Sequence, residues 1–548
     1  PGPTPGHDRH CVPHHPLLWF SKIAYGIRGP LRLAMAIMTT TAADLLDRDF
    51  GTLPDLIRAN ALRHPDKLAI ADDDSAISYA ELDRLMNRIA AALQRDGTAQ
   101  RQAVASVSYP SVAQAAVFLG TLRAGSVAAP IQPSATPEQI AGMIADSGAD
   151  IVFLDAANAA ALSGQAIAAR VLMLEELDAW LAHGDVAPAP VTIAPGDGFN
   201  IIYSSGTTGI PKGIVQSHAM RWQHLSRNAA AGFDRAVTLL ATPLYSNTTL
   251  VSFLPTLAWG GSVVLMKKFD ARRYLELAQH YRATHTMLVP VQYQRIMALP
   301  DFDAFDLASF RFKTCTSAPF KPELKRDVLT RWPGLLVEYY GMTEGGGSCG
   351  LNATEHPDKL HTVGRPMPGH DIRLIDDDGN EVPPGATGEI VGRSPAMMNG
   401  YHGREQATAD ATWVSPQGER FIRHGDVGRF DEDGFLILMD RKKDMIISGG
   451  FNIYPSDIEA VLAQHPAVAD GTVVGVPSEQ WGETPVGFYV PRAGTTADAA
   501  TVLADTNAKL GKTQRLSALH ATDELPRSAI GKVLKRELRD RLAAGEFA

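Results

Sequence analysis

The 548-residue sequence contains little cysteine and no long apolar run. Its three cysteines, Cys11, Cys315 and Cys349, are far apart and form no Cys-x-x-Cys pair. This spacing argues against a disulfide framework and a structural zinc site, so we expect a reducing, cytoplasmic compartment. No uncharged apolar stretch reaches the ~20 residues that a membrane-spanning helix needs. We therefore expect no stable membrane insertion.

An excess of basic charge is also missing. The chain has 51 Lys and Arg against 60 Asp and Glu, a formal net charge of -9. This balance argues against nucleic acid as a partner but allows a local basic pocket for an anionic cofactor. With 45% hydrophobic residues, a chain of this length can bury the cores of several domains.

The first 50 residues differ from the rest. The chain begins with proline and carries four histidines within its first 15 residues, ahead of Met38. We expect residues 1–50 to be a disordered leader or a non-native extension, with the true start near Met38. A secretory signal with Leu31–Met38 as its apolar part is the alternative, but that run is short and no compact basic segment precedes it.

Helical and β-like patterns alternate along most of the remaining chain. Leu53–Arg63 and Tyr79–Asp96 have helical periodicity, whereas Ala103–Ser108 and Ile151–Leu154 are short β-like runs. This alternation continues to about residue 345 and predicts an α/β fold.

After Gly364 the sequence becomes rich in turns and β-like segments, which favours a barrel-like or mixed subdomain. A charged joint, Asp440–Asp444, leads into a small α+β part that ends in a basic helix, Val533–Leu542. We place a large domain at residues 51–440 and a small C-terminal domain at 441–548.

The segment Tyr203–Gly213 concentrates glycines, hydroxyls and one lysine after an apolar strand. Glycines let backbone N–H groups surround an oxyanion, and hydroxyls and a lysine add donors and charge. A polar surface turn is the alternative. The segment lacks the Gly-Lys-Ser/Thr ending of a Walker loop; Gly511–Thr513 has that ending, but Thr506 replaces the first glycine. The phosphate-binding candidates are Ser204, Ser205, Gly206, Thr207, Thr208, Gly209 and Lys212.

This loop resembles the signature of adenylate-forming enzymes: acyl-CoA synthetases, peptide-synthetase adenylation domains and luciferases. Glu338–Glu344 resembles their second nucleotide motif, which implies an aromatic ring near adenine, Thr343 at the phosphate and Glu344 holding Mg²⁺ through oxygen. Cys315–Phe320 resembles the segment lining the adenine and acyl sites. The resemblance implies ATP contacts for Ser317, Ala318, Pro319, Glu338, Tyr339, Tyr340, Gly341 and Thr343.

Gly345–Gly350 spells the dinucleotide-binding pattern G-x-G-x-x-G. We reject that interpretation for two reasons. No acidic residue lies at a suitable position about twenty residues later, and no clear amphipathic helix separates the glycines from Pro357. We expect these glycines to form a flexible wall of the acyl pocket.

Two further segments continue the resemblance. His424–Asp426 resembles the family's ribose-binding segment, with Asp426 accepting hydrogen bonds from the ribose hydroxyls. Arg441–Asp444 resembles the interdomain hinge, which implies Lys443 as the hinge residue and Arg441 as a nucleotide contact. Without this resemblance, we would interpret the charged run as a solvent-exposed loop. The resemblance places coenzyme A near Gly449, Gly450 and Phe451.

Leu525–Val533 resembles the family's mobile loop, which implies Lys532 as the catalytic lysine. A lysine there stabilises charge on the substrate carboxylate and α-phosphate electrostatically. The catalytic candidates are Lys532, Glu344, Thr343 and Lys212. The resemblance spans roughly residue 50 to the C-terminus. It implies a large domain of two α/β sheets plus a distorted β-barrel and a small mobile α+β domain, using ATP, Mg²⁺ and coenzyme A.

The acid is a small-molecule carboxylic acid, and its class rests on Pro243–Thr249. Many acyl- and aryl-CoA ligases carry histidine where this chain has Ser246, and the run lacks the aspartate of amino-acid-activating relatives. We expect a ligase of the 4-coumarate and feruloyl-CoA type, a monomer or homodimer, acting on a cinnamate or benzoate derivative. A medium-chain fatty acid, transfer to a carrier protein, and luciferase-like oxidation stay open. The acyl-pocket candidates are Tyr245, Ser246, Asn247, Thr316, Tyr339, Gly345 and Gly346.

Overall fold

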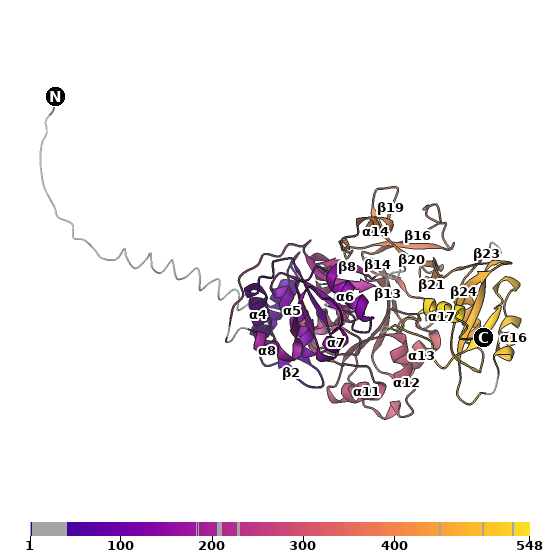
Figure 1. Ribbon diagram of the computed structural model, residues 1–548, viewed down its shortest axis with the longest axis horizontal. Coiled ribbons are helices and arrows are strands. Elements are labelled where there is room, and N and C mark those ends of the chain that lie inside the picture. The colour runs from indigo at the N-terminus through magenta and orange to yellow at the C-terminus, as the bar shows by residue number, and fades with distance from the viewer. Residues whose placement is uncertain are drawn as a thin grey trace.

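The computed structural model describes Gly2 and residues 41–181, 184, 186–204, 211–226, 231–448, 451–495, 498–528 and 531–547. Most of the expected phosphate loop, from Ser205 to Gly209, lies outside the described residues, as do Gly449 and Gly450. Two large α/β layers form the body of the molecule, and a smaller C-terminal part lies at one end (Figure 1).

The first large layer is a nine-stranded sheet in the order β15-β14-β13-β12-β11-β9-β10-β1-β2. Strands β9 to β13 pair in parallel, and β14 and β15 continue the sheet in antiparallel pairs. The bounds are β1 (Leu68–Ala71), β2 (Ala76–Ser78), β9 (Val237–Leu240), β10 (Ser262–Leu265), β11 (His285–Leu288), β12 (Phe312–Cys315), β13 (Leu335–Met342), β14 (Gly345–Asn352) and β15 (Arg365–Pro366).

The second large layer is a seven-stranded sheet in the order β18-β8-β7-β4-β3-β5-β6. Its central strands are buried at every residue, as expected for parallel strands with helices on both faces. The bounds are β3 (Ala103–Val107), β4 (Val127–Ile131), β5 (Ile151–Leu154), β6 (Arg170–Met173), β7 (Gly198–Ser204), β8 (Lys212–Ser217) and β18 (Gly400–Tyr401).

Helices between and outside these sheets complete the large domain. Ser78 caps α4 in a reciprocal capping box with Glu81, and α4 buries one apolar face. The helices are α2 (Ala42–Leu46), α3 (Leu53–Arg63), α4 (Tyr79–Arg95), α5 (Val112–Arg123), α6 (Pro137–Asp146), α7 (Ala156–Ala161), α8 (Leu177–Trp180), α9 (His218–Ser226), α10 (Asn247–Trp259), α11 (Ala271–His280), α12 (Pro290–Met297) and α13 (Pro322–Arg331).

Helix α2 lies inside the segment that we expected to be a disordered extension. Ala42 and Leu46 are buried in the same core as α3 and α10, and Phe50 packs on Trp222 with ring centroids 6.1 Å apart. The folded chain therefore begins by residue 41, ten residues earlier than the expected boundary.

A third sheet stands where the sequence predicts a barrel-like subdomain, in orange at the top of Figure 1. It has five antiparallel strands, and α14 (Glu405–Asp410) packs beside it. Its strands are β16 (Asp371–Ile375), β17 (Gly388–Arg393), β19 (Thr412–Val414), β20 (Arg420–Phe430) and β21 (Leu436–Arg441).

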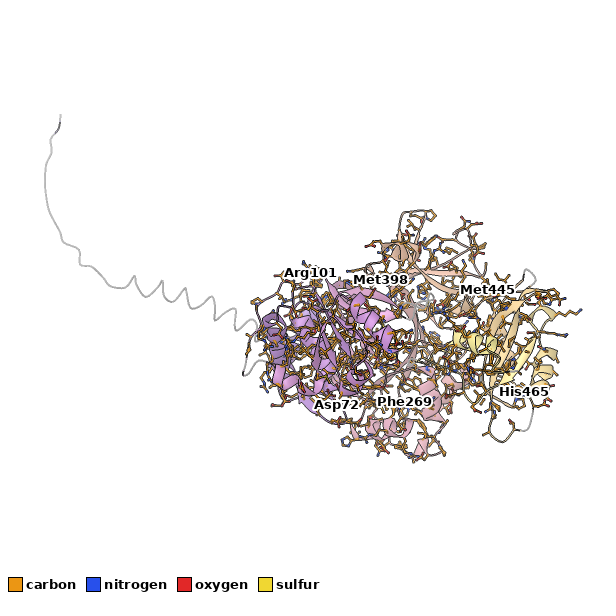
Figure 2. All side chains as sticks on the ribbon, in the orientation of Figure 1. Asp72, Arg101, Phe269, Met398, Met445 and His465 are labelled. Carbon is orange, nitrogen blue, oxygen red and sulfur yellow. The ribbon has the colours of Figure 1, made fainter. Side chains whose placement is uncertain are left out.

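The C-terminal part has a sheet and a hydrophobic core of its own. That core draws only on residues between Ile446 and Leu519, so this part packs as a separate domain. In Figure 2, Met445 and His465 lie in it, far from Asp72 and Arg101 in the large domain. Its elements are β22 (Ile446–Ser448), β23 (Phe451–Ile453), β24 (Val468–Ser478), β25 (Gly482–Pro491), β26 (Ala518–Ala521), α15 (Pro455–Leu462), α16 (Ala499–Ala508) and α17 (Lys535–Ala543).

Within the described part of the chain, no helix has both the length and the apolar character needed to cross a bilayer.

Candidate active site

The candidate site lies where parallel strands of the nine-stranded sheet end. Strands β9, β11, β12 and β13 run in the same direction, so their carboxyl ends share one edge. The segments that follow three of these strands are Pro243–Ser246, Thr316–Phe320 and Thr343–Glu344. Ligands of open α/β sheets bind outside the carboxyl ends of the strands, so the topology gathers the predicted motifs where a ligand belongs.

The loop after β12 is held in an uncommon backbone conformation. Ser317 has φ 83°, in the left-handed region that non-glycine residues rarely adopt. Its hydroxyl lies 2.6 Å from that of Thr248 on α10, and Phe320 stacks on Tyr293 with ring centroids 5.2 Å apart. Contacts at both ends therefore keep the strained loop in one shape, as is common at functional sites.

The expected metal ligand, Glu344, is partnered by a tyrosine that the motifs did not single out. Tyr401 on β18 donates its hydroxyl to Glu344 Oε1 at 2.8 Å, and Lys212 Nζ lies 5.2 Å from the centre of the Tyr401 ring. Burial raises the pKa of Tyr401, so the phenol keeps its proton and stays a donor. Tyr401 thus joins the lysine of the expected phosphate loop to the expected metal ligand.

The donor set fits one Mg²⁺ bound through substrate phosphates. Tyr401 occupies one oxygen of Glu344 and leaves the other for a cation. Over the described ranges, no cluster of three or more His, Cys, Asp or Glu side chains could enclose a metal alone. Mg²⁺ commonly binds one or two carboxylates and takes its remaining ligands from phosphates and water.

Asp426 is oriented by the aromatic pair beside it. Tyr340 donates its hydroxyl to Asp426 Oδ2 at 2.8 Å, and the same hydroxyl lies 3.0 Å from His424 Nδ1. His424 Nε2 is 2.8 Å from the Gly346 carbonyl, which can only accept. Burial raises the pKa of Tyr340 well above its usual value. Tyr340 thus contacts Asp426, and it is a positioning residue for the expected ribose acceptor.

Lys532 reaches this site from the small domain. The neighbouring Gly531 packs so closely on the large domain that an added Cβ would lie 2.8 Å from Val291. Desolvation lowers the pKa of Lys532 to about 8, although the residue itself is exposed to solvent. The charges that act on it are Arg441 and Lys443, which lower the pKa further, and the carboxylates Asp426 and Glu344, which raise it. The predicted catalytic lysine is therefore within electrostatic range of two expected ATP-site carboxylates.

Glu338 differs from its expected place among the nucleotide contacts. Its carboxylate is buried and forms an ion pair with Lys325, which also donates to the Leu360 carbonyl at 2.7 Å and the Thr362 carbonyl at 3.1 Å. Burial raises the pKa of Glu338, and the adjacent ammonium acts against that shift. The pair is buried, so the Glu338 side chain fastens α13 to β13 and does not face the site.

The glycine-rich wall is a strand and not the flexible segment that we expected. Gly345, Gly346 and Gly347 begin β14, each with positive φ. A Cβ on Gly345 would lie 2.0 Å from the Ala396 carbonyl oxygen, and one on Gly346 would lie 2.8 Å from Ile422 Cβ. Glycine is therefore required here by the close approach of the third sheet and of the segment that follows β17.

Several other predicted residues can be placed in the structure. Tyr245, Asn247, Thr316 and Tyr339 are partly buried near the strand ends, and burial raises the pKa of Tyr245 to about 12. Ser246 is the N-cap of α10 and accepts from the Thr248 N–H. Arg441 Nε lies 3.4 Å from Asp426 Oδ1, whereas Lys443 is exposed between the domains. Phe451 belongs to β23.

Comparison with known proteins identifies the family to which the chain belongs. Residues 57–402 match the AMP-binding enzyme family, and residues 457–532 match the AMP-binding enzyme C-terminal domain. The chain belongs to the AMP-binding enzymes. This confirms the resemblance to adenylate-forming enzymes that the motifs carry.

Relatives of this family cover nearly the whole chain. An indoleacetate–CoA ligase from Aromatoleum aromaticum is 34% identical over 90% of this chain and 99% of its own. A feruloyl-CoA synthase from Amycolatopsis is 34% identical over 87% and 96%. A fatty acid–[acyl-carrier-protein] ligase from Streptomyces coeruleorubidus is 31% identical over 89% and 96%.

Solved structures confirm the fold. ATP-bound MatB from Rhodopseudomonas palustris has a TM-score of 0.78 and 30% identity, covering 89% of this chain and 99% of its own. The amide bond synthetase McbA from Marinactinospora thermotolerans has a TM-score of 0.79 and 27% identity over 89% and 99%. The expected architecture of a large α/β domain with a small C-terminal domain is thereby confirmed.

Proposed function

We propose that this protein is an ATP-dependent acid–CoA ligase that converts an aromatic carboxylic acid first into its acyl-adenylate and then into its coenzyme A thioester. One observation supports the proposal most: Lys532 of the small domain is close enough to Asp426 and Glu344 of the large domain for both carboxylates to act on its charge. A cation near the expected ribose acceptor and the expected metal-binding carboxylate suits charge development at an α-phosphate.

In the first step, the acid's carboxylate attacks the α-phosphate of ATP and pyrophosphate leaves. Asp426, oriented by Tyr340, accepts hydrogen bonds from the ribose hydroxyls and fixes the nucleotide. Lys532 holds its positive charge beside the reacting oxygens. Glu344 would hold Mg²⁺, which neutralises phosphate charge when bound.

In the second step, the thiol of coenzyme A attacks the acyl-adenylate and releases AMP. The small domain turns about Lys443, which withdraws Lys532 and brings the Gly449–Phe451 segment to the thiol entrance. Two of the contacts to be broken are the packing of Gly531 on Val291 and the ion pair of Lys321 with Asp470, 3.8 Å away. Exposed ion pairs of that kind contribute little, so rotation meets a low barrier at this contact.

The aromatic preference rests on the pocket candidates and on the relatives. Tyr245 and Tyr339 are partly buried rings near the strand ends, and flat acids pack well on such faces. Two of the relatives are named for indoleacetate and ferulate. A medium-chain fatty acid is the second candidate, and the fatty acid–[acyl-carrier-protein] ligase keeps a carrier-bound thiol as an alternative acceptor. We place the reaction in the cytoplasm, catalysed by a monomer or homodimer.

Product analysis tests the proposal. The enzyme is incubated with ATP, Mg²⁺ and a panel of hydroxycinnamic, benzoic, indoleacetic and medium-chain fatty acids, with either free coenzyme A or a phosphopantetheine-loaded carrier protein. We expect an aryl-CoA thioester by mass spectrometry. If the thioester forms only on the carrier protein, the acceptor is the carrier protein and not free coenzyme A. If only fatty acids react, the substrate is a fatty acid and not an aromatic acid.

A further inference from the structure

A buried arginine lies behind the candidate acyl site and belongs to none of the predicted motifs. Arg221 on α9 is 1% exposed, and no carboxylate among the described residues pairs with it. Its partners are two amides on neighbouring strands: Nε donates to Asn200 Oδ1 at 3.0 Å, and Nη2 donates to Gln216 Oε1. A buried charge without a counter-ion needs such acceptors.

The arginine determines which way both amides face. A guanidinium has five N–H donors and no acceptor, so Asn200 must present its oxygen to it and donate with its nitrogen. Asn200 Nδ2 indeed donates to Gln216 Oε1 at 3.0 Å. Burial lowers the pKa of Arg221 to about 9, so it keeps its charge at neutral pH. Gln216 therefore has its oxygen committed to two donors.

Gln216 connects this hydrogen-bond network to the candidate site. Its Nε2 donates to the Thr343 carbonyl at 2.6 Å and lies 3.5 Å from Asn247 Oδ1. Because Gln216 offers only N–H groups on this side, Asn247 can meet it only with its oxygen. The amide NH₂ of Asn247 is then the group left for another partner, and within the described ranges no protein atom accepts from it.

The position of Asn247 makes that NH₂ group available to a substrate. Asn247 is the first residue of α10, directly after Ser246, and its side chain is only partly buried. The next residue, Thr248, touches Ser317 of the strained loop after β12. The donor thus stands among the segments that meet at the carboxyl ends of the strands.

We propose that Asn247 is a specificity-determining hydrogen-bond donor, fixed in that role by Arg221 through Gln216, and that the acid carries an oxygen acceptor on its non-reacting part. This inference rests on the proposed function, since it names a property of the acid that the ligase takes. An aryl ether or carbonyl oxygen has the required chemistry. A site that presents a committed donor discriminates against an analogue that leaves this donor unpaired.

Matched acids test the inference. A methoxy group and an ethyl group have similar size, but only methoxy accepts a hydrogen bond. We would measure kcat/KM for thioester formation with methoxy- and ethyl-substituted cinnamates and phenylacetates, varying the ring position. The wild-type protein should favour methoxy over ethyl by about ten-fold at one ring position, the scale of one neutral hydrogen bond.

Three variants should change that ratio in defined ways. Asn247→Leu should bring it to about one while the ethyl acid still reacts. Asn247→Asp keeps the bond to Gln216 but presents a second acceptor, so the ratio should fall below one. Arg221→Leu frees both amides to turn and should lower the ratio. Thr256→Val is the matched control: it removes the bond from the Thr256 hydroxyl to the Ser252 carbonyl within α10, so it should change both rates equally and leave the ratio intact.

The outcomes separate the two proposals. Thioester formation with a ratio near one at every position, or a ratio that survives Asn247→Leu, overturns the role of Asn247. If every variant lowers kcat/KM for both acids by the same factor, Asn247 has a structural role only. No thioester or acyl-adenylate from any acid in the wild-type protein would instead overturn the proposed function.

Discussion

Replacing Lys532 by alanine should separate the two half-reactions. The ammonium is a small-domain charge close enough to Asp426 and Glu344 for both carboxylates to act on it. Removing one preorganised group aimed at developing charge costs about 10²–10³ in rate, or about 2.7–4 kcal/mol of transition-state stabilisation. We therefore expect acyl-adenylate formation to fall by that factor. Thiol transfer should keep nearly its wild-type rate, because Lys532 has left the site in that step.

The assay measures each half-reaction alone. Single turnovers with acid and ATP are quenched and the acyl-adenylate is quantified; preformed acyl-adenylate is then mixed with coenzyme A and the thioester is followed. Arg536→Ala is the control, since Arg536 lies close in sequence, is 70% exposed and has only a 3.8 Å contact with Asp540. A loss of the same size in both half-reactions of Lys532→Ala would refute the assigned role.

Three further outcomes are expected. Because desolvation lowers the pKa of Lys532 to about 8 and the charged form is needed, kcat/KM for ATP should fall as pH rises through that value. Lys532→Arg should remove this alkaline decline; if the decline persists, another group titrates. Tyr340→Phe leaves Asp426 without its 2.8 Å donor and should raise KM for ATP up to about ten-fold, but not KM for 2′,3′-dideoxy-ATP. An equal rise for both nucleotides would contradict the positioning role. Glu338→Ala strands the buried Lys325 ammonium and should cost about 3–5 kcal/mol of stability, seen as a lower melting temperature. The double variant Lys325→Met with Glu338→Leu should recover most of the lost stability. An unchanged melting temperature of Glu338→Ala would argue against a buried pair.

The α/β body could be predicted from sequence because its parallel strands are short continuous apolar runs between helical patterns. The expected run Ile151–Leu154 has the same bounds as β5, and Ala103–Ser108 is one residue longer than β3. The site motifs could be placed because they follow apolar strands of this kind. A local pattern thus predicts an element well when the element is buried on both faces.

The glycine tract was harder because its reason lies elsewhere in the chain. Gly345–Gly350 has no β-branched residue, so its composition predicts a loop. It is a strand because β13 pairs with it and the third sheet leaves no room for side chains. In the same way, α2 looks like part of an extension until its burial against α3 is seen.

Supporting residues of the site could not be found from motifs. Tyr401 is 57 positions from Glu344, and Gln216 is 127 positions from Thr343, yet each pair is hydrogen-bonded. Such contacts depend on how separate sheets pack, which no local pattern encodes. The same holds for Glu338, whose motif position suggested a ligand contact but whose partner is Lys325.

The most direct test of the account is pyrophosphate release from ATP and Mg²⁺ with each acid of the panel, measured with and without coenzyme A. We predict release that depends on an aromatic acid, one bound acyl-adenylate per enzyme without coenzyme A, and continuous turnover to thioester when coenzyme A is added. Absence of acid-dependent pyrophosphate release across the whole panel would contradict it.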